Sequence, residues 1–168
     1  LKAMALASDR VAEFTDGSYE FSTEFDDSAA ATDGPLKIHV KVTIAGSDMI
    51  VDLSGCSPQR NSGINGRTLA APYIAYKALT SPVEPVNEGS FRALKVGLPE
   101  GNFMMAKFPA PMASWSGALP SVIDAILAAM APARKEITPA AHKGAMGDNM
   151  TFFGTDPATG KRFVVQST

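Results

Sequence analysis

The chain has 168 residues, of which 45% are hydrophobic, 8% aromatic and 19% charged, so it holds enough apolar side chains for a packed core and is not a disordered protein. Its 15 Lys and Arg against 17 Asp and Glu give a net charge of −2, without the basic surplus that a nucleic acid partner requires. The single cysteine excludes an internal disulfide, and the longest apolar stretch, Ser114–Ala133, contains Asp124 and two prolines, which argues against a membrane span.

The first half of the chain predicts one helix and three strands. Apolar residues in 1–14 recur at helical spacing, and Ser18–Phe25 alternates as a strand does. The clearest strand is Leu36–Ile44, where aliphatic side chains alternate with polar ones, so we expect one buried face and one wet face. A tight turn leads to Met49–Leu53, the predicted antiparallel partner in a hairpin. The glycine-containing stretch Ser54–Gly66, which follows, is long enough to be a functional loop.

The second half predicts two further helices and three further strands. We expect Pro120 to open the second of these two helices and Pro132 to end it. The last two strands flank a short turn and predict another hairpin. The fold class is therefore α+β, with antiparallel β-hairpins, an antiparallel sheet and several packed helices. The expected helices are Thr68–Leu79 and the stretch between the two prolines, and the expected strands are Phe91–Leu98, Asn149–Phe153 and Arg162–Gln166.

Local patterns in the loops give candidate functional residues but no complete motif. The run Gly154–Lys161 departs from a phosphate-binding loop in its glycine spacing and in Arg162, which stands where Ser or Thr would hold magnesium. Cys56 has no histidine near it in sequence and is expected to be a packing residue. His142 lies in the glycine-punctuated loop 138–148 with little packing reason, so a chemical role and a solvated turn both stay open. No histidine spacing typical of a metal site is present.

The ends of the chain predict an internal segment of a longer protein. The sequence does not begin with Met, and Leu1 already lies in a helical pattern with no capping residue before it. The last residues, Phe163–Gln166, lie inside a strand-like run. We therefore expect residues 1–168 to be a single internal segment of a larger subunit.

Three stretches, taken in order, carry a resemblance to a known family. They are DGSYE at Asp16–Glu20, VDLSGCSPQ at Val51–Gln59 continuing to Gly63–Asn65, and VNEGSFR at Val86–Arg92 closing with LPEG at Leu98–Gly101. Together they resemble the hydantoinase B/oxoprolinase family, which includes the B-type subunits of N-methylhydantoinase, 5-oxoprolinase and acetophenone carboxylase-like enzymes. Nearly the whole chain takes part, and the combination is more specific than any one motif.

The resemblance implies an ATP-dependent cytoplasmic enzyme built from two kinds of subunit. A hydantoinase A-type partner binds ATP and phosphorylates the substrate, and the B-type subunit then opens a cyclic amide such as a hydantoin or 5-oxoproline. The family's divalent metal ion is held by histidine and acidic residues in an N-terminal part that this sequence does not contain, so we expect no metal or other cofactor on this segment. The isolated segment is expected to be inactive, and neither nucleic acid nor a membrane is an expected partner.

Two departures from the usual hydantoinase pattern keep other functions open. Ala113–Ser116 stands where a Gly-Asn-Val-Glu-Thr type sequence is more usual, and His142–Gly144 stands where Ser-Gln-Gly is more usual. They leave an ATP-dependent ketone carboxylase of the acetophenone carboxylase type as an alternative. A structural segment that docks another subunit, with no chemistry of its own, is a third alternative, and Phe103–Phe108 is expected to be exposed and to suit such an interface.

The chemistry implied by the resemblance needs a site that holds an anionic, phosphorylated intermediate. Amide and backbone donors stabilise developing negative charge, and a nearby cation binds the phosphate. His142 and Lys143 are the expected catalytic residues, which contact the activated substrate. For two asparagines in the binding set, turn formation beside a glycine is an equally good explanation. The expected substrate-binding residues are Asn65, Asn87, Glu88 and Arg92.

Overall fold

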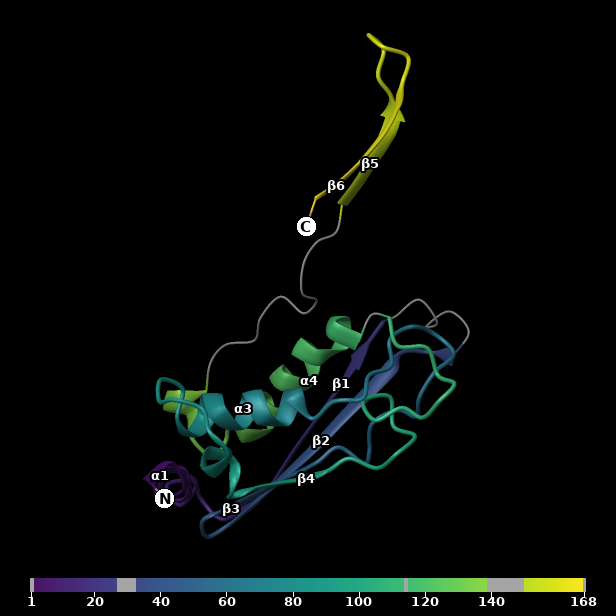
Figure 1. The fold of residues 1–168 in the computed structure, drawn as a ribbon. Helices are drawn as coiled ribbons and strands as arrows, with labels where there is room; N and C mark the ends of the chain where they lie inside the picture. The colour runs from purple at the N-terminus through teal and green to yellow at the C-terminus, as the bar shows by residue number, and fades with distance from the viewer. Residues whose placement is uncertain (1, 27–32, 114, 139–149, 168) are drawn as a thin grey trace.

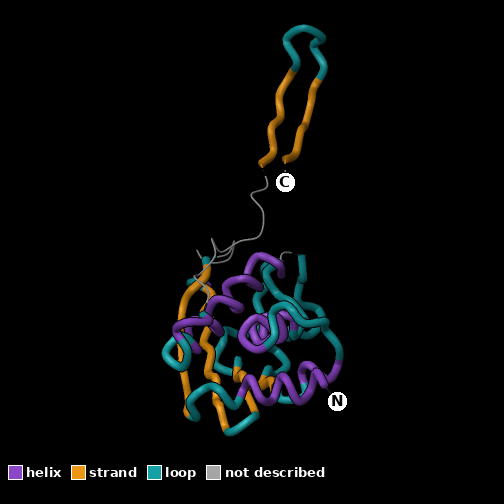
Figure 2. The backbone as a smooth tube through the Cα atoms, turned by 90° about the vertical axis from the view of Figure 1, so that its left-hand side faces the viewer, coloured by secondary structure: helices purple, strands orange, loops and turns teal. Residues whose placement is uncertain are grey.

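The computed structural model describes residues 2–26, 33–113, 115–138 and 150–167 of the chain (Figure 1). The elements, in chain order, are α1 (Lys2–Val11), β1 (Gly17–Phe25), β2 (Leu36–Ala45), β3 (Asp48–Asp52), α3 (Ala70–Thr80), η1 (Glu88–Phe91), β4 (Leu94–Gly97), α4 (Trp115–Met130), η2 (Lys135–Ile137), β5 (Met150–Thr155) and β6 (Arg162–Ser167). One sheet has the strand order β1-β2-β3-β4, and β5 and β6 form a second, two-stranded sheet. Figure 2 shows the helices gathered on one side of the four-stranded sheet.

Strand β2 lies at the centre of the core, as its sequence pattern predicts. Every second residue from Leu36 to Ile44 is buried, and the residues between them are exposed or half-buried. Antiparallel pairing with β1 runs along the whole strand, from Gly17 opposite Ile44 to Phe25 opposite Leu36. Pairing with β3 across a tight turn confirms the predicted hairpin. Because helices cover one face of this sheet, the polar residues of β2 occupy the other face.

Helix α4 begins earlier than the sequence predicts. We expected Pro120 to open it, but the helix begins at Trp115 and Pro120 lies inside it. Ala118 and Leu119, just before the proline, are buried, so their burial outweighs the backbone hydrogen bond that proline cannot make. The helix packs against α3 and against the first two strands. Among the described residues, no helix is long and apolar enough to cross a lipid bilayer.

The predicted strand Phe91–Leu98 is wrong in its first half. Glu88–Phe91 forms the short helix η1, and β4 begins only at Leu94. This strand pairs with β3 in parallel, with Leu94 opposite Met49, so the four-stranded sheet is mixed rather than wholly antiparallel. The reason is the long connection between β3 and β4, which includes α3 and returns the chain in the direction of β3. The α+β class itself is confirmed.

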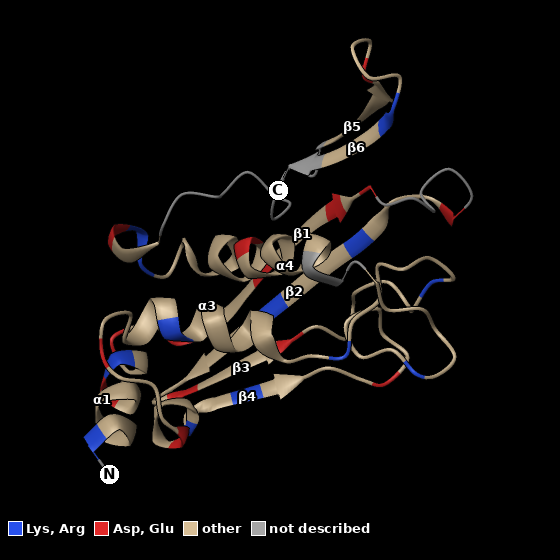
Figure 3. Cartoon of the chain, turned by 45° about the horizontal axis from the view of Figure 1, so that its top comes forward, with Lys and Arg blue, Asp and Glu red and all other residues tan. Residues whose placement is uncertain are grey.

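The segment Phe103–Phe108, which the sequence predicts to be an exposed interface, belongs mostly to the core. Phe103 and Met104 are buried, whereas Phe108 is 96% exposed. The buried Asn102 anchors the segment, because its amide donates to the Leu53 carbonyl and accepts from the Met104 N–H, each at 2.9 Å. Figure 3 shows acidic and basic residues interspersed over the described elements, in agreement with the balanced charge of the chain.

Candidate functional site

Three of the predicted substrate-binding residues lie around the short helix η1. Asn87 precedes this helix in an extended conformation, Glu88 is its first residue, and Arg92 follows its last. The backbone N–H of Asn87 donates to Ser90 Oγ at 3.3 Å, and the Ser90 N–H donates to the Asn87 carbonyl at 2.9 Å. These reciprocal bonds fix the turn and leave the Asn87 side chain exposed.

Helix α1 packs against η1 beside Gly89, whose missing side chain leaves room for the Asn87 amide. A Cβ atom at residue 89 would lie 3.1 Å from Asn87 Oδ1 and 3.6 Å from the backbone nitrogen of Met4. The first distance is shorter than an ordinary van der Waals contact, so a side chain would push the Asn87 amide aside. Gly89 therefore allows the Asn87 side chain to keep its place beside the turn.

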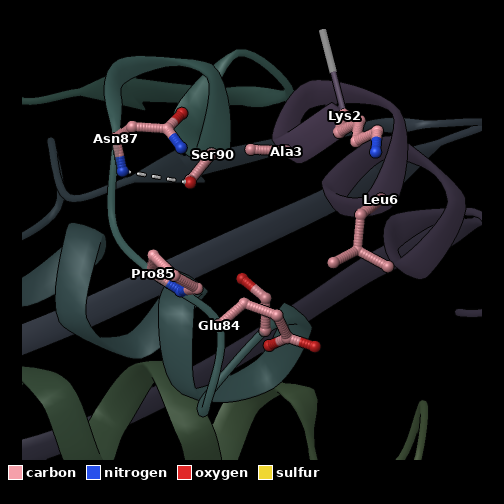
Figure 4. A pocket seen from close by; sticks show the side chains of 8 residues that line it. Lys2, Ala3, Leu6, Glu84, Pro85, Asn87 and Ser90 are labelled. Atoms are coloured by element: carbon pink, nitrogen blue, oxygen red, sulfur yellow. Dashed lines mark hydrogen bonds between the residues drawn. The ribbon is translucent and has the colours of Figure 1, made fainter.

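A pocket of about 360 Å³ lies between α1 and the segment 81–90. Figure 4 shows the Asn87 side chain and the Lys2 ammonium on opposite sides of this pocket. Ala3, Leu6 and Pro85 supply apolar wall, and the remaining residues supply polar groups. Apolar walls with a few polar groups are typical of small-molecule sites. The lining residues are Lys2, Ala3, Leu6, Ser81, Glu84, Pro85, Asn87 and Ser90.

Glu84, which lines this pocket, has an unsatisfied hydrogen-bond acceptor beneath the pocket surface. The residue is half-buried, and its Oε2 atom is fully buried with no hydrogen-bond partner among the described residues. The backbone carbonyl of Glu84 accepts from Lys77 Nζ at 2.8 Å, and the same ammonium donates to the carbonyl and the hydroxyl of Ser81. All three N–H donors of the Lys77 ammonium are thus bound to groups that follow the C-terminal end of α3. An unpaired buried carboxylate oxygen is unfavourable, and because protein atoms cover Oε2, a ligand N–H pairs with it only after the Glu84 side chain turns into the pocket.

Glu88 and Arg92 line a different hollow, with a volume of about 510 Å³. Its wall is aromatic, because the rings of Tyr73 and Phe91 meet edge to face with their centroids 4.7 Å apart. The short helix therefore divides the predicted binding residues between two cavities. Asn87 belongs to the pocket beside α1, whereas the charged pair belongs to the aromatic hollow.

Asn65, another predicted binding residue, lies apart from both cavities. Its side chain is fully buried, and Oδ1 accepts from the Arg60 N–H at 2.7 Å. Nδ2 donates to the carbonyls of Arg60, Ser62 and Pro111 at 2.7 to 2.9 Å. Both amide hydrogens are therefore engaged in holding the loop Ser54–Gly66 against the segment before α4. This geometry gives Asn65 a bracing role and offers no support for direct contact with substrate.

The predicted catalytic pair, His142 and Lys143, lies outside the described residues, so its role stays a prediction from sequence. Cys56 is described: its Sγ donates to the His39 carbonyl at 3.2 Å and accepts from the His39 N–H at 3.4 Å. Burial raises the pKa of the Cys56 thiol, which is the opposite of what an activated nucleophile needs. The part of the chain that the structure describes contains no group of three or more His, Cys, Asp or Glu that could hold a metal ion.

Glu84 and Lys2 are the pocket residues that sequence reasoning missed. Glu84 lies in a bend between Pro82 and Pro85, and Lys2 lies in the first turn of α1. Each stretch would be expected to face solvent, and no local spacing links them. The contact between α1 and η1 brings Lys2 and Glu84 to one pocket. The only feature of the sequence that could have indicated a binding residue was a carboxylate in a segment stiffened by prolines.

Comparisons with known proteins find relatives that are several times longer than this chain. An uncharacterised protein of Methanocaldococcus jannaschii is 30% identical over 117 residues, which are 67% of this chain and 21% of that protein. A Pseudomonas protein described as the B-type subunit of a D-/L-hydantoinase is 32% identical over 137 residues, which are 73% of this chain and 23% of that protein.

Two solved structures share the fold of almost the whole chain. The ATP-dependent caprolactamase of Pseudomonas jessenii matches with a TM-score of 0.80 and 25% identity, covering 98% of this chain and 28% of that one. The nucleotide-free acetone carboxylase matches with a TM-score of 0.78 over 98% of this chain and 24% of that one. At 17% identity, the second likeness shows the fold alone.

The chain thus spans about a fifth to a quarter of the length of the relatives it matches. A model of the family described as hydantoinase B/oxoprolinase matches residues 2–168, which is nearly the entire sequence. This match agrees with the stretches around Asp16, Val51 and Val86 that carry the resemblance in the sequence itself. The chain belongs to the hydantoinase B/oxoprolinase family.

Proposed function

We propose that this chain is part of a B-type subunit of an ATP-dependent enzyme that opens a cyclic amide, of the hydantoin or 5-oxoproline type, after an A-type partner has phosphorylated it. Two similarities support this reaction class, one to a protein described as the B-type subunit of a hydantoinase and one to an ATP-dependent caprolactamase. The single observation that supports the substrate class is the unpartnered Oε2 of Glu84, a residue that lines the pocket beside α1.

A cyclic amide has the pattern of donor and acceptor that this pocket complements. Within a small ring the amide is cis, so its N–H and its C=O lie on the same side of the ring. In the proposed complex the Glu84 side chain turns into the pocket and its carboxylate accepts the N–H, while the Asn87 amide or the Lys2 ammonium donates to the C=O. A pocket of about 360 Å³ suits one such ring with a short substituent.

Phosphorylation allows the ring to open near neutral pH. A phosphoryl group on the amide oxygen turns the stable amide into an imidate phosphate, whose carbon is far more electrophilic. Water adds to that carbon, the C–N bond breaks with transfer of a proton from the added water to the ring nitrogen, and hydrolysis of the resulting acyl phosphate gives the carboxylate and inorganic phosphate. In the proposal ATP is bound by the A-type partner rather than by this chain. His142 and Lys143 contact the phosphorylated intermediate, because an ammonium and an imidazolium both stabilise an anion.

Substrate-dependent ATP hydrolysis by the full-length subunit, assembled with its A-type partner, tests the proposal. Hydantoin, 5-oxoproline and caprolactam are compared with acetone and acetophenone in the presence of bicarbonate. We expect ATP hydrolysis coupled to a ring-opened product with at least one cyclic amide and with neither ketone. ATP turnover with a ketone and bicarbonate, but with no cyclic amide, would overturn the assignment.

A ketone carboxylase is the second candidate function. The departures at Ala113–Ser116 and His142–Gly144 favour it, and the shared fold with acetone carboxylase is compatible with it. A ketone has no N–H, however, so it leaves Glu84 without a donor in the pocket. This mismatch is why we favour a cyclic amide.

A purely structural role in subunit docking makes a different prediction for Asn87. If the chain only docks another subunit, Asn87→Ala weakens assembly and leaves the turnover of each assembled complex unchanged. If Asn87 binds the substrate carbonyl, the same variant assembles normally and raises KM by about tenfold, which corresponds to one hydrogen bond. Sedimentation of the complex and steady-state kinetics on the same preparation separate the two results.

A further inference from the structure

The β5–β6 hairpin carries apolar side chains on both of its faces. Paired residues of an antiparallel ladder lie on one face, and successive residues of a strand lie on opposite faces. Phe152 pairs with Val165 on one face, and Phe153 pairs with Val164 on the other. Phe163, two residues before Val165, joins the first face. The hairpin therefore lacks the polar face that a solvent-exposed strand pair usually has.

None of these side chains is covered by the residues that the structure describes. Their exposed fractions range from 43% for Phe163 to 77% for Phe153. An isolated two-stranded hairpin is marginally stable at best in water, and exposed aromatic rings on two faces favour association. The stem of the hairpin therefore needs a cover on each face.

The turn at the tip of the hairpin has the opposite character. The Asp156 carboxylate accepts from the Thr159 hydroxyl at 2.7 Å and from the Ala158 N–H at 2.8 Å, and these bonds lower the pKa of the Asp156 carboxyl. The Asp156 N–H donates to the Lys161 carbonyl at 2.8 Å and closes the turn. The tip satisfies its own polar groups, so a cover is needed along the stem and not at the turn.

The edges of the hairpin also lack the features that keep exposed strands apart. Neither β5 nor β6 contains a proline or a lysine, and Arg162, beside the turn, is the one charged residue of the two strands. Edge strands that face solvent usually carry such residues to prevent pairing with other strands. The outer edges of the hairpin can therefore pair with another strand, just as its two apolar faces can pack against other apolar side chains.

The size of related proteins indicates where the cover comes from. The fold match with caprolactamase includes 98% of this chain, and so most of the hairpin, but only 28% of that chain. We propose that the β5–β6 hairpin inserts between two apolar layers of its own, longer subunit, formed by parts of the polypeptide outside residues 1–168. Burial on both faces is typical of a protein core, whereas a transient docking surface has one apolar patch with a polar rim.

Hydrogen exchange of the full-length subunit, purified without its partner and kept monomeric, tests this proposal. Amides in 151–154 and 163–165 are expected to exchange at least about a hundredfold more slowly than in an unstructured chain, at a rate independent of protein concentration. Protection that appears only on dimerisation would assign the cover to a second copy. Protection that requires the A-type subunit would assign it to the partner. Either result overturns the proposal, as does an absence of protection in all three states.

Matched variants separate the two faces of the stem from the tip. Phe152→Asp and Phe153→Asp, one on each face, are each expected to speed exchange throughout the hairpin by tenfold or more, whereas Ala158→Lys in the turn leaves it unchanged. An effect on one face alone would show that a single layer covers the hairpin and that insertion between two layers is wrong. If the aspartate variants do not fold, Phe152→Leu and Phe153→Leu give the same comparison with a smaller change.

Discussion

The hydroxyl group of Tyr76 is buried in the core with no hydrogen-bond partner among the described residues. Its ring packs near Phe91, with the centroids 6.1 Å apart, and so helps to hold α3 against η1. We predict that Tyr76→Phe leaves the free energy of unfolding unchanged or raises it by up to about 1 kcal/mol, because the ring contacts remain and an unpaired hydroxyl is removed. Chemical denaturation of the 168-residue chain measures this, and a clear loss of stability would show that the hydroxyl has a partner.

The same hydroxyl predicts a loss of stability at alkaline pH. Burial raises the pKa of Tyr76 to about 12 from an ordinary value of 10.0. Between these two values the folded state keeps a proton that the unfolded state has lost, so the free energy of unfolding falls as the pH rises. Below the ordinary pKa of 10.0 the contribution is fully present. Between these two pH values the free energy of unfolding of Tyr76→Phe is expected to fall less steeply than that of the natural protein. Equal slopes of the free energy against pH for the two proteins would contradict the raised pKa of Tyr76.

Cys56 is predicted to be dispensable for activity. Its buried thiol is held by the backbone of His39 and has a raised pKa, so little thiolate is present near neutral pH. Cys56→Ser in the assembled enzyme should keep most of its activity, since serine preserves the size of the side chain and both hydrogen-bonding roles. A loss of about a hundredfold or more in kcat, with the fold intact, would mean that the thiol takes part in the chemistry.

His142 and Lys143 are predicted to contact the anionic intermediate. His142→Ala and Lys143→Ala in the complete enzyme should each lower kcat/KM by roughly ten- to a thousandfold with little change in Tm. Because both side chains act on one charge, the two losses should be less than additive in the double variant. Near-normal kinetics of both variants would show that the loop is a solvated turn.

Asn65 and Asn87 show why the binding residues could be predicted only in part. Both stand near a glycine in a loop, so the sequence gives them the same two explanations, turn formation and ligand binding. The structure separates them, because the segment around Pro111 buries Asn65 and no comparable segment among the described residues covers Asn87. Burial by a segment so distant along the chain leaves no trace in the local sequence.

At the level of whole elements, β2 allows the clearest test of the core. Val40 is fully buried under the helices, whereas Lys41 is exposed on the opposite face and pairs with Glu20 at 3.4 Å. Val40→Asp buries an unpaired charge and is expected to cost several kcal/mol, enough to unfold a marginal domain. Lys41→Gln loses a surface ion pair and is expected to cost well under about 1 kcal/mol. Thermal unfolding of both variants checks the difference, and equal sensitivity would mean that the outer face is also covered.

The elements that the sequence predicts well are those in which burial follows a simple period. β2 is such an element, because its two-residue alternation coincides with one helix-covered face. α4 is not, because burial of Ala118 and Leu119 carries the helix past Pro120, against local propensity. The parallel pairing of β4 also escapes prediction, since strand direction depends on how the intervening connection crosses the sheet.

On the scale of the whole molecule, the candidate pocket arises where α1 meets the segment around η1, at the margin of the helix-covered sheet (Figure 1). The sequence predicts the α+β class and carries the family resemblance in its motifs, but it does not show that Lys2 and Asn87 line one pocket. That arrangement depends on a contact between α1 and η1, two segments far apart in the chain. Pockets formed in this way become visible only in the folded molecule.

The claim that Glu84 accepts the N–H of a cyclic amide is tested most directly by removing that N–H from the substrate. Steady-state kinetics of the assembled enzyme are measured with a lactam and with its N-methyl derivative, for the natural protein, for Glu84→Ala and for Glu24→Ala, an exposed control on β1. The natural protein and the control should prefer the N–H substrate in kcat/KM by roughly ten- to a hundredfold, as expected for a hydrogen bond to a charged group, and Glu84→Ala should lose most of this preference. An undiminished preference in Glu84→Ala would contradict the account.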